Sequence, residues 1–390
     1  MPAKAVRPLS VSDFDFTGPL GSAGATVEQL GPNYFKVTLG AAPRHPEWAN
    51  MLQFTLHHAR GNPLRLDVCF HGGNDNRFNT YFYSWSYDGL DWTPIHWQQG
   101  YSLAKDSSRG DTLVFPTFQQ DTVLVGHQVP MSCETLTALL QDWSQSPHAT
   151  RVRLGDSPGG RPIWRLTITG ADSPIPPAKR LVHYFAGQHP GENNARWRLV
   201  GMIQWLLSDQ GKTFRDANVC HFVPLMSPDS PAAGWYRVNS AGVDMNRSYR
   251  SRGALQSAQT PEAWIVQKDL EGVAAAGQLT TVWSMHTCLG ELFPILHPGP
   301  EMGTRLRPWT ALRDAIRRYD PEGKLSAPLR TARPDEEGGR SEWAYGPHAQ
   351  FGVSAFLIEG GGTIFTKAEN IESGRVLIKG LADYCLAGAP

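Results

Sequence analysis

Short runs of aromatic and β-branched residues, separated by turns roughly every ten residues, occupy the chain from Phe14 to about Gly126. The pair Asp88-Gly89 lies between two such runs, and it predicts a tight hairpin because glycine tolerates the positive φ of the turn. Several short strands at this spacing are typical of an all-β fold. We therefore predict an N-terminal antiparallel β-sandwich domain over residues 1–126.

The pattern changes after Pro130. Ser132 can cap a helix, because apolar residues follow it at helical spacing. Farther along, strand-like apolar runs alternate with helical segments: runs at residues 163–168, 181–186, 219–225, 281–285 and 353–358, and helices at 193–207 and 261–270. Runs buried on both faces favour a parallel sheet. We predict an α/β domain over residues 127–390, with a mixed, largely parallel central sheet flanked by helices.

Composition narrows the functional classes. The 390 residues contain 36 Lys and Arg and 36 Asp and Glu, so no general field attracts nucleic acid or an anionic membrane. No signal-peptide pattern and no apolar run of membrane-spanning length is present, which favours a cytoplasmic protein. The five cysteines are scattered and never form CxxC, so a bound zinc ion would need histidine and carboxylate ligands.

A candidate metal site lies in the segment GQHPGE, between a predicted strand and a predicted helix. His189 and Glu192 are three residues apart in this turn, close enough to reach one metal ion. Sites in open α/β sheets gather beyond the carboxyl ends of strands. Imidazole and carboxylate are common zinc ligands, and a catalytic zinc takes three protein ligands. A third ligand must therefore come from another segment.

Two further residues end predicted strands. His286 follows the run TTVWSM, and Glu359 follows the run VSAFLI. His286 and His297 are the candidates for the third ligand, whereas His183 and His221 lie inside apolar runs and are expected in the core. The sequence thus predicts a metal and an acid–base residue at one edge of the sheet.

The segment GWYRVNSAGVDMNRSY contains Arg237, Asn246 and Arg247 in a loop-rich region. Two arginines and an asparagine near a metal suit an anionic group, because a guanidinium offers a planar fork of donors that matches a carboxylate. A positive group there can also stabilise charge that develops on a carbonyl oxygen.

A rival nucleophile pattern, GxSxG, occurs at residues 155–159 around Ser157. A nucleophile elbow is followed by a helix, but here the strand-like segment RPIWRLTIT follows. We interpret this segment as a turn between strands.

At these residues the chain resembles the zinc metallocarboxypeptidases (funnelins). Within that family it is most similar to the cytosolic-carboxypeptidase branch, and it resembles a bacterial-type member of this branch. The matching blocks, in family order, are LGDSPGGRPIWRLTIT, HPGE, GWYRVNSAGVDMNRSY, SMHTC and FLIEGG. They span residues 154–361. The resemblance implies the zinc carboxypeptidase fold, preceded by a β-rich domain as in that branch.

The resemblance also implies a role at each matching position. His189, Glu192 and His286 would bind one zinc ion per chain, and Glu359 would be the general base and acid. Arg237 would stabilise the oxyanion. Asn246 and Arg247 would bind the C-terminal carboxylate of a peptide or protein substrate. The implied activity is hydrolysis of the last peptide bond, or of a side-chain glutamyl bond.

The specificity pocket is implied less directly. Arg340, in GGRSEWAY, matches the segment that lines the pocket for the last side chain, and a cation there would favour acidic residues. The chain has no tyrosine between Asp320 and Trp343, where pancreatic members carry a mobile one, so we expect no phenolic lid.

Two alternatives remain. A zinc amidohydrolase or deacylase acting on a small acylated metabolite would keep the metal and base without needing both carboxylate-binding residues. A binding protein with a vestigial metal site would bind without turnover. For partners, we expect no nucleic acid and no membrane, and we expect the N-terminal domain to contact the substrate or another subunit.

Overall fold

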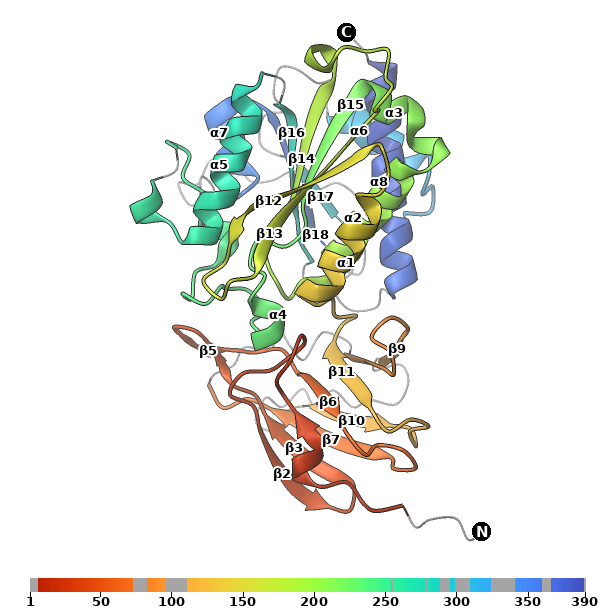
Figure 1. Ribbon diagram of the computed structural model, residues 1–390, viewed down its shortest axis with the longest axis vertical. Helices are drawn as coiled ribbons and strands as arrows, with labels where there is room; N and C mark the ends of the chain where they lie inside the picture. The colour runs from red at the N-terminus through yellow and green to blue at the C-terminus, as the bar shows by residue number, and fades with distance from the viewer. Residues whose placement is uncertain are drawn as a thin grey trace.

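The computed structural model describes residues 6–72, 83–95, 111–253, 255–277, 279–287, 295–298, 309–323, 341–359 and 366–388. The molecule is elongated and has two parts (Figure 1). The N-terminal sheets lie at one end, and a larger sheet flanked by helices lies at the other.

The N-terminal part contains two packed sheets. The first has the order β1 (Phe14–Asp15), β6 (Gln53–Leu56), β11 (Val123–His127), β8 (Tyr83–Ser86) and β9 (Trp92–Ile95). The second has the order β10 (Asp111–Phe115), β7 (Leu64–Cys69), β3 (Tyr34–Thr38) and β2 (Thr26–Gly31). A short hairpin pairs β4 (Ala41–Ala42) with β5 (His45–Ala49).

These two sheets share one hydrophobic core. Phe35 of β3, Leu66 of β7, Phe54 of β6 and Val125 of β11 belong to the same buried cluster. The predicted hairpin at Asp88-Gly89 joins β8 to β9. The predicted antiparallel sandwich is therefore confirmed, with one exception: β3 and β7 pair in parallel.

The larger part is built on a seven-stranded sheet. Its order is β12 (Ala149–Asp156), β13 (Pro162–Thr169), β15 (Asn218–Val223), β14 (Leu181–Gly187), β16 (Leu279–Met285), β18 (Ser354–Glu359) and β17 (Ile295–Pro298). The four strands from β15 to β18 are parallel to one another, and the strands outside them pair antiparallel. The predicted mixed, largely parallel sheet is confirmed.

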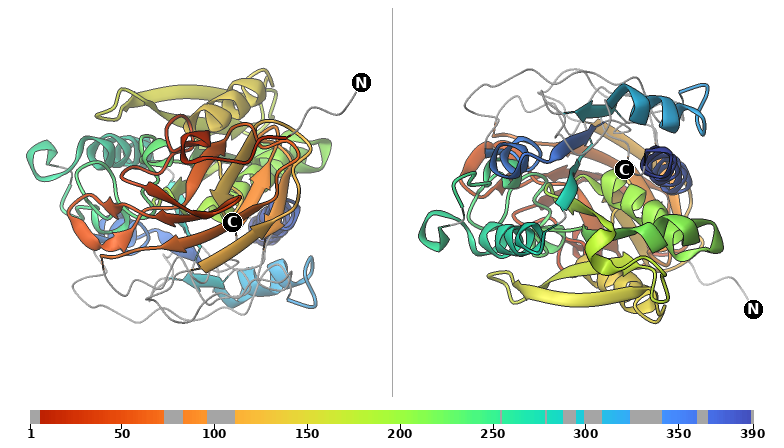
Figure 2. Two further views of the ribbon diagram at one scale, coloured as in Figure 1. Left: turned by 90° about the horizontal axis from the view of Figure 1, so that it is seen from below. Right: turned by 90° about the horizontal axis from the view of Figure 1, so that it is seen from above.

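Helices cover both faces of this sheet, as the view from above shows (Figure 2, right). On one face are α5 (Pro261–Ala275) and α7 (Tyr345–Phe351). On the other are α1 (Cys133–Trp143), α2 (Asn193–Leu207), α3 (Lys212–Ala217), α6 (Trp309–Arg317) and α8 (Lys367–Ala387). A further short helix, α4 (Ser230–Ala233), faces the N-terminal sheets (Figure 1). Ser132 caps α1 as predicted, since its side chain accepts a hydrogen bond from the Thr135 amide.

Two glycines let α2 and α8 approach closely. A Cβ added at Gly201 of α2 would lie 1.9 Å from the carbonyl oxygen of Ile371, and one added at Gly374 of α8 would lie 1.9 Å from that of Arg198. Only glycine allows the two backbones to come this close. The contact fixes α2, which begins next to Glu192.

The predicted domain boundary falls close to the end of β11. The core of the N-terminal sheets extends to Val125, and the core of the larger part begins at Val129. The division at residues 126 and 127 itself stays a prediction.

Among the described helices, none is both long and apolar enough to cross a membrane.

A buried histidine makes the stability depend on pH. His183 lies inside β14, with Nδ1 2.7 Å from Thr281 Oγ1 and Nε2 2.9 Å from Asn218 Oδ1. Asn218 donates its own amide hydrogen to Phe214 O, and Trp283 donates to Thr281 Oγ1. Donors and acceptors therefore match a neutral imidazole that accepts at Nδ1 and donates at Nε2.

We expect this histidine to weaken the fold in acid. Burial lowers the pKa of His183 from 6.5 to about 4. Because the unfolded chain takes up the proton first, the contribution is complete above pH 6.5 and is lost as the pH falls toward 4. The loss should be about 3 kcal/mol in the free energy of unfolding. Denaturant titrations of metal-free protein at pH 7, 5.5 and 4 would measure it.

The control compares two substitutions. His183→Gln should reduce the pH dependence, whereas His71→Gln, at an exposed position, should leave it as in the wild type. An equal slope in the wild type and His183→Gln would contradict the assignment.

Candidate metal site

The candidate site lies where the parallel strands end. His189 follows β14, His286 follows β16, and Glu359 is the last residue of β18. The His286 amide donates to Ile358 O (2.8 Å), so the ends of β16 and β18 are tied together. The structure thus brings together residues that the sequence predicted at strand ends.

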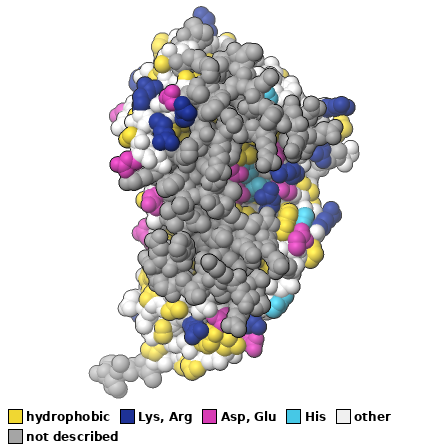
Figure 3. Space-filling view, turned by 180° about the vertical axis from the view of Figure 1, so that it is seen from behind, with side chains coloured by type: hydrophobic (Ala, Val, Ile, Leu, Met, Phe, Trp, Pro, Cys, Tyr) yellow, Lys and Arg dark blue, Asp and Glu magenta, His cyan; other side chains and the backbone are white. Residues whose placement is uncertain are grey.

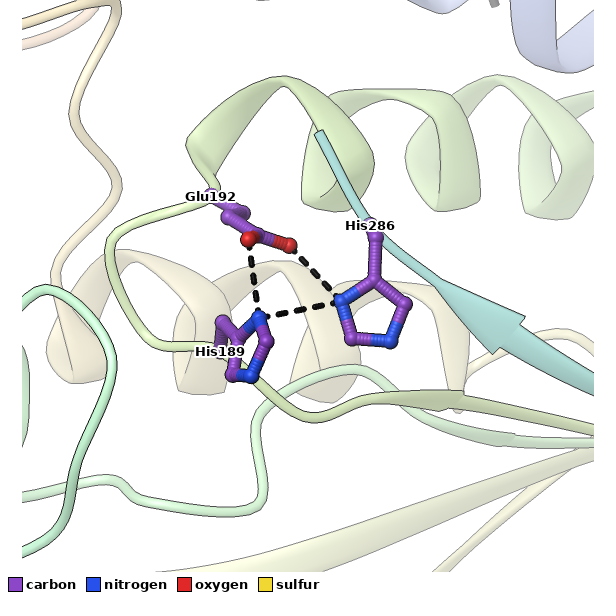
Figure 4. Close-up of side chains that lie close together, drawn as sticks. All are labelled: His189, Glu192 and His286. Carbon is purple, nitrogen blue, oxygen red and sulfur yellow. Dashed lines mark hydrogen bonds and ion pairs between the residues drawn. The ribbon is translucent and has the colours of Figure 1, made fainter. Parts of the chain in front are cut away.

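Three potential metal ligands converge there. Within the described part of the chain, one cluster has the geometry to hold a metal ion: His189, Glu192 and His286, all buried, with ligand atoms within 4.8 Å of one another. The two Nδ1 atoms are 3.1 Å apart, and each faces an oxygen of Glu192, at 2.8 Å from His189 and 2.9 Å from His286 (Figure 4). The figure shows that a loop, the start of α2 and the end of β16 supply the three side chains.

The outer nitrogen of each ring has its own partner. His189 Nε2 lies 2.9 Å from Asp244 Oδ1, and a carboxylate accepts. His286 Nε2 lies 2.8 Å from Ser284 Oγ, whose hydroxyl donates to Gln188 Oε1 at 2.9 Å. These partners hold a hydrogen on each Nε2, so that Nδ1 of each ring is the atom that would bind a metal at the centre. Such outer partners are what orients histidine ligands at metal sites.

Glu192 is held as an anion. Burial alone would raise its pKa, but the charges of His189 and His286 outweigh burial and lower the pKa below its usual range. The amide of Thr287 also donates to its Oε2 at 3.0 Å. An ionised carboxylate is the form that binds a metal.

Glu359 has a different environment. Burial raises its pKa to about 7, and the charge of His286 opposes that rise. The charge of Glu192 also raises this pKa, and the charge of Arg237 lowers it. A carboxylate with a pKa near neutral suits general base catalysis.

Asp244 links the metal ligands to the arginine loop. Its Oδ2 accepts a hydrogen bond from Arg237 Nε at 2.6 Å, while its Oδ1 accepts from the Asn246 amide at 2.9 Å. The side chain thereby caps a short 3₁₀ turn, Met245–Arg247. Asp244 was not predicted from the sequence, where its position two residues before Asn246 was the available indication.

A distant segment orients Asn246 and Arg247. The Trp343 amide donates to Asn246 Oδ1 at 2.9 Å, so the NH₂ group of Asn246 is directed away from that contact. Glu342 Oε1 lies 3.1 Å from Arg247 Nη1. The side chain of Arg247 is 48% exposed. Two sets of donors are thus available for an anionic group.

Two buried arginines of α2, which the sequence analysis also missed, hold the ligand-bearing loops. Arg196 donates to Pro190 O at 2.6 Å, and Arg198 donates to His286 O at 3.0 Å. Burial lowers the pKa of Arg198 to about 10. The available indication was the presence of two arginines in a helix whose other residues are mostly buried. A buried charged side chain needs a partner, so arginines in such a helix are expected to bind a neighbouring segment.

The structure describes some of the remaining candidates. Arg340 and the side chain of His297 are outside the described residues. His183 and His221 are buried in the sheet, as expected. Ser157 lies in the turn between β12 and β13, as expected. Seen from behind, the molecule shows basic, acidic and histidine side chains together near its middle (Figure 3).

Comparison with known proteins identifies the domain. Residues 136–268 match the family model described as zinc carboxypeptidase. Cytosolic carboxypeptidase 2 of Danio rerio is 34% identical over 148 residues, which are 36% of this chain and 20% of that protein. The Homo sapiens protein of the same name is 32% identical over 149 residues, 36% of this chain and 16% of that protein. The chain thus matches about a fifth, or less, of the length of these curated relatives.

A solved structure matches nearly the whole chain. The crystal structure of a metallo-carboxypeptidase from Burkholderia cenocepacia has a TM-score of 0.77 and 20% sequence identity, and the match covers 96% of this chain and 99% of that one. At this identity the likeness shows the fold. The predicted zinc carboxypeptidase fold, with β-sheets ahead of it, is confirmed.

Residues 136–268 therefore match the zinc carboxypeptidase family, and the predicted resemblance is confirmed over that segment. Zinc is the metal of this family, as predicted. The buried set of two imidazoles and one carboxylate fits zinc, because His₂Glu is a known catalytic zinc set. The family match includes His189 and Glu192 but ends before His286, which the structure brings to them.

Proposed function

We propose that this protein is a zinc-dependent metallocarboxypeptidase that hydrolyses the C-terminal peptide bond, or a side-chain glutamyl bond, of peptides or proteins. One observation carries the proposal. The metal-ligand cluster and a carboxyl group with a raised pKa lie at the ends of neighbouring parallel strands, and Asp244 connects His189 to the loop that carries Arg237 and Arg247. These are the groups that hydrolysis next to a terminal carboxylate requires.

Each residue has a distinct part in the proposed mechanism. When bound by His189, Glu192 and His286, zinc supplies a Lewis acid that polarises a carbonyl and acidifies bound water. Glu359 takes a proton from the attacking water and returns it to the leaving amine. Its partly buried position raises its pKa, so it exchanges protons near neutral pH.

Asn246 and Arg247 are proposed to bind the substrate's terminal carboxylate. A guanidinium donates two parallel hydrogen bonds to a carboxylate, and the amide adds a third donor. The Trp343 amide holds Asn246 Oδ1, which leaves the NH₂ group for the substrate. This arrangement selects for a free C-terminus.

We expect Arg237→Ala to lower kcat by roughly 10²–10³-fold, the usual cost of removing one oxyanion donor. Arg237 is 23% exposed and is fixed by Asp244, so its remaining donors keep a defined direction. Zinc content should stay at one per chain, because Asp244 still binds His189 and the Asn246 amide. Steady-state kinetics with elemental analysis would measure both. Arg153→Ala, at an exposed ion pair on β12, is the control; a kcat within a few-fold of wild type for Arg237→Ala would reject this role.

The first experiment compares free and blocked peptides. Purified protein of known zinc content is incubated with peptides that end in a free acid and with the same peptides as C-terminal amides. The acids should be cleaved with a kcat/KM at least roughly tenfold higher, since hydrogen bonds to a charged group contribute about 1.5–3 kcal/mol. Equal cleavage of both forms, or no cleavage of the acids, would reject the carboxypeptidase.

Equal cleavage would favour the zinc amidohydrolase or deacylase, which has no need of the terminal carboxylate. Binding of peptides without turnover would favour a protein with a vestigial metal site.

For the pocket, we propose that Arg340 favours acidic C-terminal residues. Peptides ending in Glu, Lys and Phe test this, and equal rates would discard it.

We further propose a cytoplasmic location, supported by the names of the cytosolic carboxypeptidases that the chain matches. The proposed substrates are peptide or protein C-termini, and neither nucleic acid nor membrane is a proposed partner. The zero formal net charge supports this view. Domains are proposed at residues 1–126 and 127–390.

A further inference from the structure

The arginine loop contains a tight turn between Arg237 and Asp244. Val238 and Asp244 form an isolated antiparallel bridge. Within it, the Asn239 amide donates to Val243 O (3.2 Å) and the Gly242 amide donates to Asn239 O (2.9 Å). We call residues 238–244 the site turn. Since the site turn begins next to Arg237 and ends at Asp244, its shape sets where these two side chains lie.

The tip of the site turn contacts the N-terminal hairpin. His45 of β5 lies with Nε2 2.9 Å from Gly242 O. A carbonyl oxygen only accepts, so this nitrogen donates. Gly242 has φ +72°, and a Cβ there would lie 2.4 Å from Pro43 O. The hairpin and the turn therefore meet backbone to backbone.

The His45 side chain is itself held in place. Its ring stacks on Trp48 of the same hairpin, with centroids 3.8 Å apart and planes 8° from parallel. A stacked ring keeps one orientation and loses little further freedom when it donates. The hydrogen bond to Gly242 thus joins two preformed elements.

The N-terminal sheets also hold the chain just before Arg237. Backbone amides of Gly21, Ala23 and Met51 donate to the carbonyl oxygens of Pro231 (3.2 Å), Ala233 (2.8 Å) and Gly234 (2.6 Å). These carbonyls belong to α4 and its end, which face the N-terminal sheets in Figure 1.

Tyr236 completes this connection. Its ring meets the edge of His127 at 5.7 Å between centroids, and its carbonyl accepts from the Gly191 amide at 2.7 Å. Gly191 lies between His189 and Glu192. Contacts with the N-terminal part therefore bracket Arg237 on both sides in sequence, through residues 231–236 and through Gly242.

We propose that the N-terminal part is a structural component of the active site, in which His45 is a positioning residue that holds the site turn and thereby directs Arg237 and Asp244. The inference rests on the proposed function for its kinetic consequence. A donor that moves by about 1 Å can lower a rate by about 10²-fold even when the altered residue is remote. His45 touches neither the ligands nor the proposed substrate groups, so its effect must pass through the turn.

The test uses three full-length variants. His45→Ala removes the donor to Gly242. His45→Gln keeps an N–H donor at this position and should restore it. Lys367→Ala removes another hydrogen bond between the two parts, from Lys367 Nζ to Leu90 O (2.8 Å), which lies away from the turn.

Two readouts are expected to agree. In hydrogen exchange followed by mass spectrometry, the amides of residues 236–244 should exchange roughly tenfold faster in His45→Ala and as in wild type in the other two variants. In kinetics, His45→Ala should lower kcat roughly tenfold with KM within twofold, because Arg237 acts on the transition state. His45→Gln should regain most of kcat.

Wild-type exchange in His45→Ala would overturn the inference, and so would equally faster exchange in Lys367→Ala. The exchange readout does not need catalysis. If the wild-type protein releases no C-terminal residue, the proposed function fails, while exchange still decides whether the N-terminal hairpin holds the site turn.

Discussion

Glu359→Gln is expected to lower kcat/KM by about 10²–10⁴-fold while zinc stays bound at wild-type stoichiometry. An amide has nearly the size of the carboxyl group but cannot accept the proton of the attacking water. Glu359 is not among the three converging ligand residues, so its replacement leaves the metal donors intact. The variant should therefore separate metal binding from catalysis.

The measurement combines kinetics on a free-acid peptide with elemental analysis and a thermal unfolding curve. Glu28→Gln is the matched control, because it makes the same change at a carboxylate that is 67% exposed in the N-terminal part. Glu28→Gln should keep wild-type kcat/KM. A Glu359→Gln enzyme within tenfold of wild type would show that another group is the base.

The sequence allowed much of the site to be predicted because the relevant residues end apolar runs. His286 and Glu359 each follow a run that is buried on both faces. Parallel strands share one carboxyl edge, so residues that end different strands meet there. This prediction depends only on where each apolar run lies in the sequence, and it does not require the order of the strands in the sheet.

Residues that act through another side chain were not predictable in this way. Ser284 lies inside an apolar run, and only the three-dimensional contact with His286 Nε2 distinguishes it from a core serine. Asp244 lies in a loop, where no periodic pattern of apolar residues indicates the direction in which a side chain points. Its contacts with His189 and Arg237 depend on how the site turn folds.

Strand order was also beyond the sequence. Turn signals indicate which consecutive strands form hairpins, as at Asp88-Gly89, but not which distant strands pair. β3 and β7 pair in parallel, and the hairpin of β4 and β5 lies between these two strands in the sequence. That hairpin carries His45 to the site turn, so the connection between the two parts appears only in the structure.

Removing one ligand should cause a large loss of metal affinity. A structural zinc site contributes about 10–16 kcal/mol over four ligands, which is about 2.5–4 kcal/mol for each. His286→Ala should therefore weaken zinc binding by roughly 10²–10³-fold, and activity should fall with zinc occupancy. Competition with a chelator of known affinity would measure the change.

Asp244→Asn provides a graded comparison, because outer partners of ligating histidines contribute about 10–100-fold in metal affinity. Asp244 keeps His189 Nε2 protonated and its Nδ1 directed at Glu192, so the variant should bind zinc more weakly than wild type but more tightly than His286→Ala. Stability gives a second measure, since a ligand that binds only the folded state raises the unfolding temperature. Added zinc should stabilise wild type most and His286→Ala least. Equal stabilisation of all three proteins would place the metal elsewhere.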